Sequence, residues 1–140
     1  MRAIRFIFAA VILCSVSSFV STTEKHDPLI GTWVYAEYDE QEEAMIYTKA
    51  SSFEEDKPGI EFKASGKLVK RQNVGWCGTP PIDYGNNDGT WKQTSDSIIT
   101  ISYHYWGGTA EEDWQIVQVS DTKLMVKQLD YRTDRKTHLD

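Results

Sequence analysis

The sequence predicts an all-β fold, an eight-stranded antiparallel up-and-down barrel formed by a single domain. Three observations lead to this fold class. Apolar and polar residues alternate from residue 29 onward, short turns rich in Gly, Ser and Asp recur, and no long segment has helical spacing. Because closing a sheet removes the exposed edges that an open meander leaves, we expect a barrel rather than a sandwich.

The first 21 residues precede this pattern and read as a secretory signal peptide. Arg2 and Arg5 are followed by the apolar run 4–13 and by several serines. We therefore expect export, to the periplasm or out of the cell, with residues 22–28 as a short polar lead-in. Cys14 offers a lipoprotein alternative, which we disfavour because the residue before it, Leu13, is large and the cysteine lies inside the apolar run.

Charge and cysteine content limit the partners of the mature chain. Removing two arginines with the leader changes the net charge from −6 to −8. This acidity disfavours nucleic acid and anionic membrane surfaces as partners. Cys77 then stands alone, so no disulfide within the chain is expected even though export would permit one. A domain of this size can fold on its hydrophobic core.

The predicted barrel domain extends over residues 29–131, and a charged tail, 132–140, is expected to fray. The turns at 65–66 and 94–96 are short and polar, as hairpins require. The predicted strands are 30–38, 44–49, 59–64, 67–72, 89–93, 97–103, 112–119 and 123–129.

One long segment interrupts the alternation. Residues 73–88 contain three glycines, three asparagines and the pair Pro80-Pro81. Proline removes donors from a strand ladder, so the segment is predicted to be a loop. Loops this long in a compact domain are usually functional or disordered, and the aromatic residues in this one favour a function.

Two Gly-Thr-Trp motifs, at 31–33 and 89–91, open the first and fifth predicted strands. Together with the patterns Trp-Gln-Ile at 114–116 and Leu-Met-Val at 124–126, they make the chain resemble small secreted lipocalin-like (calycin) domain proteins of bacteria. The resemblance implies an eight-stranded barrel, often with an interior cavity that holds a ligand.

Strand counting predicts where the unusual residues gather. In an up-and-down barrel alternate connections share an end, which places 50–58, 73–88 and 104–109 together with the N-terminal entry. We expect Trp33 and Trp91 to begin strands there and to close that end, as part of one aromatic cluster. Loop residues next to glycines are better candidates for recognition. The predicted cluster is Trp33, Trp76, Tyr84, Trp91, Tyr105 and Trp106. The predicted ligand-binding residues are Trp76, Cys77, Tyr84, Tyr103, Tyr105 and Trp106.

Catalytic and metal-binding patterns are not found. The three histidines are scattered, the acidic groups lack calcium-loop spacing, and no phosphate-binding or nucleophile motif occurs. We therefore expect no cofactor, no metal and no catalytic residue. A Cys77–His104 nucleophile and base pair is the least favoured alternative.

The favoured function is binding of a small or hydrophobic molecule by an exported, non-catalytic barrel. The alternative is a secreted or periplasmic protein-interaction or inhibitor module that presents the 73–88 loop. Residues 1–21 are expected to be removed, so no transmembrane anchor is expected in the mature protein.

Overall fold

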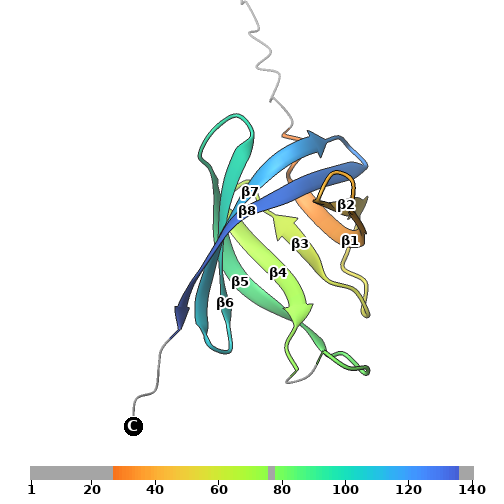
Figure 1. The fold of residues 1–140 in the computed structure, drawn as a ribbon, viewed down its shortest axis with the longest axis vertical. Helices are drawn as coiled ribbons and strands as arrows, with labels where there is room; N and C mark the ends of the chain where they lie inside the picture. The colour runs from red at the N-terminus through yellow and green to blue at the C-terminus, as the bar shows by residue number, and fades with distance from the viewer. Residues whose placement is uncertain (1–26, 76–77, 136–140) are drawn as a thin grey trace, which may run out of the picture.

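The computed structural model describes residues 27–75 and 78–135, so the predicted signal peptide lies outside the described residues. Figure 1 shows an all-β structure. Its strands are β1 (Gly31–Asp39), β2 (Ala44–Ala50), β3 (Gly59–Phe62), β4 (Lys67–Asn73), β5 (Tyr84–Gln93), β6 (Ile98–Tyr105), β7 (Gly108–Val119) and β8 (Lys123–Arg135).

The sheet closes into an antiparallel barrel in the order β1-β2-β8-β7-β6-β5-β4-β3. The predicted fold class, an eight-stranded antiparallel barrel, is therefore confirmed. One detail of the order differs from simple strand counting. β1 pairs with both β2 and β3, so it lies between them, and β2 pairs with β8.

This order changes which connections share an end of the barrel. Since β2 and β3 are both antiparallel to β1, they run in the same direction, and segment 51–58 leads from the end of β2 back to the opposite end of the barrel, where β3 begins. The β1–β2 turn, segment 74–83 and the β6–β7 turn share one end, which we call the loop end. The N-terminal entry and the other three turns share the opposite end, which we call the N-terminal end (Figure 1). The expected grouping was therefore right in placing the connections 73–88 and 104–109 at one end. It was wrong in placing the N-terminal entry and segment 50–58 with them, because it assumed that β2 and β3 are neighbours.

The predicted loop 73–88 is shorter than expected. Tyr84 already belongs to β5 and pairs with Asn73 of β4, which leaves residues 74–83 as the connection. No apolar alternation marks this strand, because glycines occupy the inward positions 85 and 89 and polar residues the outward ones. An outward pair, Arg71 and Asn86, is joined by a hydrogen bond of 3.0 Å.

The hairpin of β7 and β8 is longer than expected and spans much of the molecule in Figure 1. β7 begins at Gly108, and β8 continues to Arg135, which pairs with Gly108. Arg132 was predicted to lie in a fraying tail. It instead lies opposite Glu111 in this ladder and is joined to it by an ion pair of 2.7 Å. A charged segment forms a strand here because the outward Arg132 pairs with the carboxylates around it.

The core is densest toward the N-terminal end. Trp33 is fully buried, and its indole Nε1 donates to the carbonyl of Leu29 over 2.8 Å. Lys49 lies over the same ring at 4.3 Å. Trp91 packs edge-on against Phe62 at 5.4 Å between ring centroids. The tryptophans of both Gly-Thr-Trp motifs therefore close one end of the barrel, but it is the end opposite segment 74–83.

Gly89 lies at a close approach of two strands, and Gly89→Ala should be strongly destabilising. An added Cβ would lie 2.0 Å from the carbonyl oxygen of Ser102 and 2.9 Å from Cα of Tyr103. Both are backbone atoms, so no side-chain rotation relieves the overlap, and we expect a loss of about 3 kcal/mol or more in urea unfolding. At Gly78 a Cβ would meet nothing within 4 Å. Gly78→Ala should stay within about 0.5 kcal/mol, and equal losses in the two variants would contradict this account.

Candidate functional site

The inner face of the barrel changes character along its length. Toward the N-terminal end it carries large apolar side chains such as Phe62 and Ile99. Toward the loop end the inward positions carry Lys70, Tyr103 and Glu112, of which Glu112 is only 4% exposed. Charged residues are almost never fully buried unless they are paired. The loop half of the interior is thus a polar region beside a solid apolar plug.

Glu112 is the centre of this region. Its Oε1 accepts a hydrogen bond of 2.5 Å from the hydroxyl of Tyr103 and one of 2.6 Å from Nζ of Lys70. Its Oε2 accepts one of 2.6 Å from the indole of Trp114. Three donors from three strands therefore satisfy one buried carboxylate. We call Glu112, Lys70, Tyr103 and Trp114 the polar cluster.

Burial and charge shift the proton equilibria in and around this cluster. Desolvation lowers the pKa of Lys70, although Glu112 opposes that shift. Burial, together with the carboxylate of Glu112, raises the pKa values of Tyr103 and Tyr47. The tyrosines therefore stay neutral donors at physiological pH. Lys70 also lies 4.1 Å from the ring centre of Tyr103, which adds a cation–π contact.

Asn87 extends the polar wall across the neighbouring strand. It is the register partner of Lys70, so both side chains project from the same face of the sheet. Its Nδ2 is buried and has no hydrogen-bond partner among the described residues. An unmade hydrogen bond of this kind costs about 1–3 kcal/mol. The polar wall of the interior therefore contains one donor whose hydrogen bond is not made within the described residues.

A cleft opens at the loop end, where β8 leaves β2. The pairing of these strands stops at Met45 and Val126, whereas β8 continues to Arg135 beside β7 alone. The cleft has a volume of about 410 Å³. It is lined by Tyr38, Glu43, Met45, Gln128, Leu129, Asp130 and Tyr131.

The cleft adjoins the polar cluster. Tyr131 is the register partner of Glu112, and the phenol of Tyr131 contributes to raising the pKa of Tyr103. On the other wall, Met45 accepts a hydrogen bond of 3.7 Å at its sulfur from the hydroxyl of Tyr47. A molecule in the cleft would therefore lie between two aromatic walls, with the polar cluster next to it.

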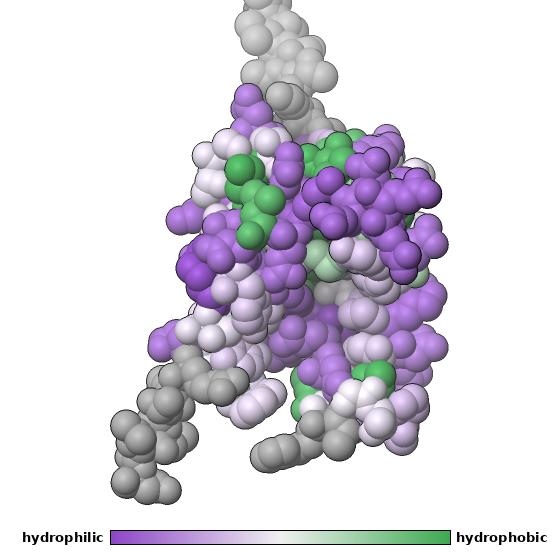
Figure 2. Space-filling view, viewed as in Figure 1, coloured by the Kyte–Doolittle hydropathy of each residue, from purple (hydrophilic) through white to green (hydrophobic). Residues whose placement is uncertain are grey.

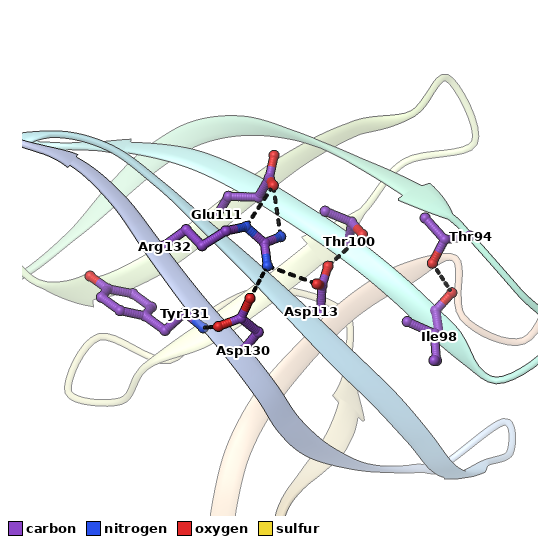
Figure 3. A network of polar contacts seen from close by, with 8 residues as sticks. All are labelled: Thr94, Ile98, Thr100, Glu111, Asp113, Asp130, Tyr131 and Arg132. Carbon is purple, nitrogen blue, oxygen red and sulfur yellow. Dashed lines mark hydrogen bonds and ion pairs between the residues drawn. The ribbon is translucent and has the colours of Figure 1, made fainter.

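On the outer side of the β7–β8 hairpin, Arg132 holds three carboxylates together. Its guanidinium bonds Glu111 at 2.7 Å and Asp113 at 2.9 Å, and it also bonds Asp130 (Figure 3). In the same view the ring of Tyr131 points away from this network. The network fixes the part of β8 that pairs with β7 alone, and this part forms one wall of the cleft.

The pKa of Asp113 tests this network. Hydrogen bonds from Arg132 and Thr100 lower that pKa below its usual value of 3.8. Because the folded-state pKa is depressed, the stabilisation is present above the unfolded pKa and is lost as pH falls through the folded one. NMR titration of the Asp113 carboxyl carbon should give a midpoint below 3.8 in the native protein. Arg132→Gln should raise this midpoint, and an unchanged midpoint would contradict the assignment.

The predicted site residues are distributed over several places. Tyr103 lies in the polar cluster, whereas Tyr84, Tyr105 and Trp106 lie at the loop end outside the lining of the cleft. Tyr105 and Trp106 contact edge-on at 6.1 Å, and Trp106 is 81% exposed. Trp76 and Cys77 lie outside the described residues. The predicted single aromatic cluster is wrong, because Trp33 and Trp91 lie at the opposite end.

None of the seven residues that line the cleft was among the predicted ligand-binding residues. Tyr38 and Tyr131 sit on strands whose inward face is set by bulges, after Tyr35 in β1 and at Leu129 in β8. A bulge reverses the alternation of faces, so simple counting assigns these residues to the wrong side. The sequence does contain one signal for a polar interior. Lys70 and Glu112 occupy positions where the alternation of the strand calls for an apolar, inward-facing residue.

Two further findings concern the described part of the chain. It contains no group of three or more His, Cys, Asp or Glu residues placed to hold a metal ion. Within residues 27–75 and 78–135, no helix has the length and apolar character needed to cross a membrane.

Comparison with protein families gives one match. A family model described as a lipocalin-like domain matches residues 29–126, which is more than half of the 140-residue chain. The chain therefore belongs to the lipocalin-like domain family. Comparison with curated proteins gives no match, and comparison with solved structures gives none either.

Proposed function

We propose that this protein is an exported, non-catalytic carrier that binds one small, partly hydrophobic molecule in the loop-end cleft. The observation that carries the proposal is the cleft itself. Its volume of about 410 Å³ lies within the range of small-molecule sites. Its lining is more polar than apolar, and two tyrosines, Met45 and Leu129 supply the apolar surface.

The rest of the interior argues for the same place. Trp33 and Trp114 are at most 1% exposed and fill the barrel below the cleft, so a ligand would lie at the mouth rather than deep inside. Tyr38 and Tyr131 each expose about half of their surface, 53% and 52%. Aromatic side chains that are exposed on two sides of a cleft offer large contact areas to a ligand.

The arrangement of titratable groups supports a role without catalysis. Glu112, the buried carboxylate, already accepts from three donors, and Lys70 is paired with it, so neither is held ready for proton transfer to a ligand. His104, the base of the alternative enzyme hypothesis, is exposed and lies within 3.4 Å of Thr109. Outside the cleft, it lines a separate surface hollow.

Export rests on the leader. Residues 1–21 combine two arginines, an apolar run and small residues, the pattern that directs secretion. A carrier outside the cytoplasm needs no cofactor and no disulfide for this role, because the closed barrel positions the cleft walls.

Filling the cleft tests the proposal. N-phenyl-1-naphthylamine, a neutral apolar dye that fluoresces when it leaves water, should bind the native protein saturably. Gln128→Trp places an indole in the cleft lining and should weaken dye binding at least tenfold. Gln118→Trp adds the same group on β7, away from the lining, and should leave binding unchanged. Equal binding by both variants, or no saturable binding by the native protein, would overturn the proposal.

A further inference from the structure

The charges around the cleft differ from those elsewhere in the barrel. Among its seven lining residues, Glu43 and Asp130 are acidic and none is basic. Asp130 is paired on the outer side of β8 with Arg132, which it shares with Glu111 and Asp113. Glu43 has no hydrogen bond or ion pair with any described residue. The lining is therefore net negative, and Glu43 is its acidic residue without a described cationic partner.

Glu43 is also held in an uncommon backbone conformation. Its φ is +52°, in the left-handed region that residues other than Gly, Asn and Asp rarely adopt. The β1–β2 turn that imposes it is fixed by the carboxylate of Asp39, which accepts 3.0 Å hydrogen bonds from the amides of Gln41 and Glu42. The position of Glu43 at the rim is therefore set by the turn, not by a partner for its charge.

Three cations of the described part of the chain are already engaged with other carboxylates. Lys127 lies 3.7 Å from Glu42, and Lys70 is paired with Glu112 in the interior. Arg132 is shared among three carboxylates. Figure 2 shows a largely hydrophilic surface, and the chain as a whole carries a net charge of −6. A positively charged molecule would therefore be attracted to the cleft and would meet no competing cation in its lining.

The aromatic walls suit the same kind of ligand. Tyr38 and Tyr131 present half-exposed rings, and the face of a tyrosine ring attracts an ammonium group within about 6 Å. Met45, the register partner of Tyr38, adds a polarisable apolar surface to the lining. A carboxylate at the rim beside two tyrosine rings is a combination that favours an organic cation.

We propose that the loop-end cleft selects small amphipathic ligands that carry an ammonium group, with Glu43 pairing with the charge and Tyr38 and Tyr131 contacting the apolar part. This inference rests on the proposed function, since it names the ligand class of the same cleft. It assigns Glu43 a role in ligand choice rather than in folding.

Three compounds of the same shape separate charge from hydrophobicity. In titration calorimetry at low salt, 2-phenylethylammonium should bind about tenfold more tightly than the neutral 2-phenylethanol, and phenylacetate should bind weakest. Glu43→Gln should abolish the preference for the cation. Glu40→Gln, which removes an exposed carboxylate of the same turn outside the lining, should keep most of it. Added salt should reduce the preference, because exposed charges are screened.

Each outcome has a distinct meaning. Equal affinity for the three compounds, tighter binding of phenylacetate, or an unchanged preference in Glu43→Gln would overturn the inference. If the neutral compound still binds and Gln128→Trp removes that binding, the proposed carrier function stands while the charge selection fails. If none of the compounds binds and the neutral dye does not bind either, both fail.

Discussion

Replacing Glu112 with leucine should lower the free energy of unfolding by about 3–5 kcal/mol, because the change leaves the buried ammonium of Lys70 without its partner. The hydroxyl of Tyr103 and the indole of Trp114 lose their acceptor at the same time. Lys70→Met should cost less, about 1–3 kcal/mol, since the carboxylate then keeps two of its three donors. Chemical denaturation followed by tryptophan fluorescence measures both values.

A neighbouring carboxylate provides the control. Glu111 precedes Glu112 in β7 but lies on the outer side, where its ion pair with Arg132 is about half exposed. Glu111→Leu should change stability by no more than about 1 kcal/mol, as is usual for surface pairs. The proposed centre of the polar cluster would be wrong if Lys70→Met proved more damaging than Glu112→Leu, or if Glu111→Leu matched it.

Trp33→Ala should produce a loss of similar size, about 3–5 kcal/mol, because it removes a fully buried indole from the plug at the N-terminal end. The substitution also removes the hydrogen bond of 2.8 Å to Leu29 and the ring beneath Lys49. Trp33→Phe should fall between the native protein and the alanine variant, since it keeps a ring but loses the donor.

Trp106 is the matched control for this prediction. Its side chain is 81% exposed at the β6–β7 turn, so Trp106→Ala should change stability by no more than about 0.5 kcal/mol. Comparable losses at the two positions in urea unfolding would contradict the view that Trp33 closes the barrel.

The fold was predictable because the dominant signals are local. Alternation and turn composition identify strands such as Ala44–Ala50 and Lys123–Arg135 to within a few residues at their starts. The order of β2 and β3 was not predictable, since nothing in segment 51–58 indicates that it leads back to the opposite end of the barrel. That one connection reversed the expected placement of Trp33, whereas Trp91 lies at the N-terminal end because β5 begins at Tyr84, so that Trp91 falls near its last residue.

The candidate site was harder to predict for two physical reasons. Tyr84 begins a strand that has no apolar alternation, because glycines face inward at 85 and 89. Tyr131 reaches the cleft only because a bulge at Leu129 reverses the alternation of faces. Tyr103 was named from its sequence context, but its connection to Lys70 and Glu112 depends on pairing between distant strands.

Native mass spectrometry of the protein isolated from the cells that make it tests the carrier function most directly. The native chain should retain a small molecule that dissociates on activation, and Gln128→Trp, which fills the cleft, should be found without it. Gln118→Trp should retain the same mass as the native protein. A native protein that carries no small molecule, or a Gln128→Trp variant that carries the same one, would contradict the proposal that this barrel is a carrier with its site at the loop end.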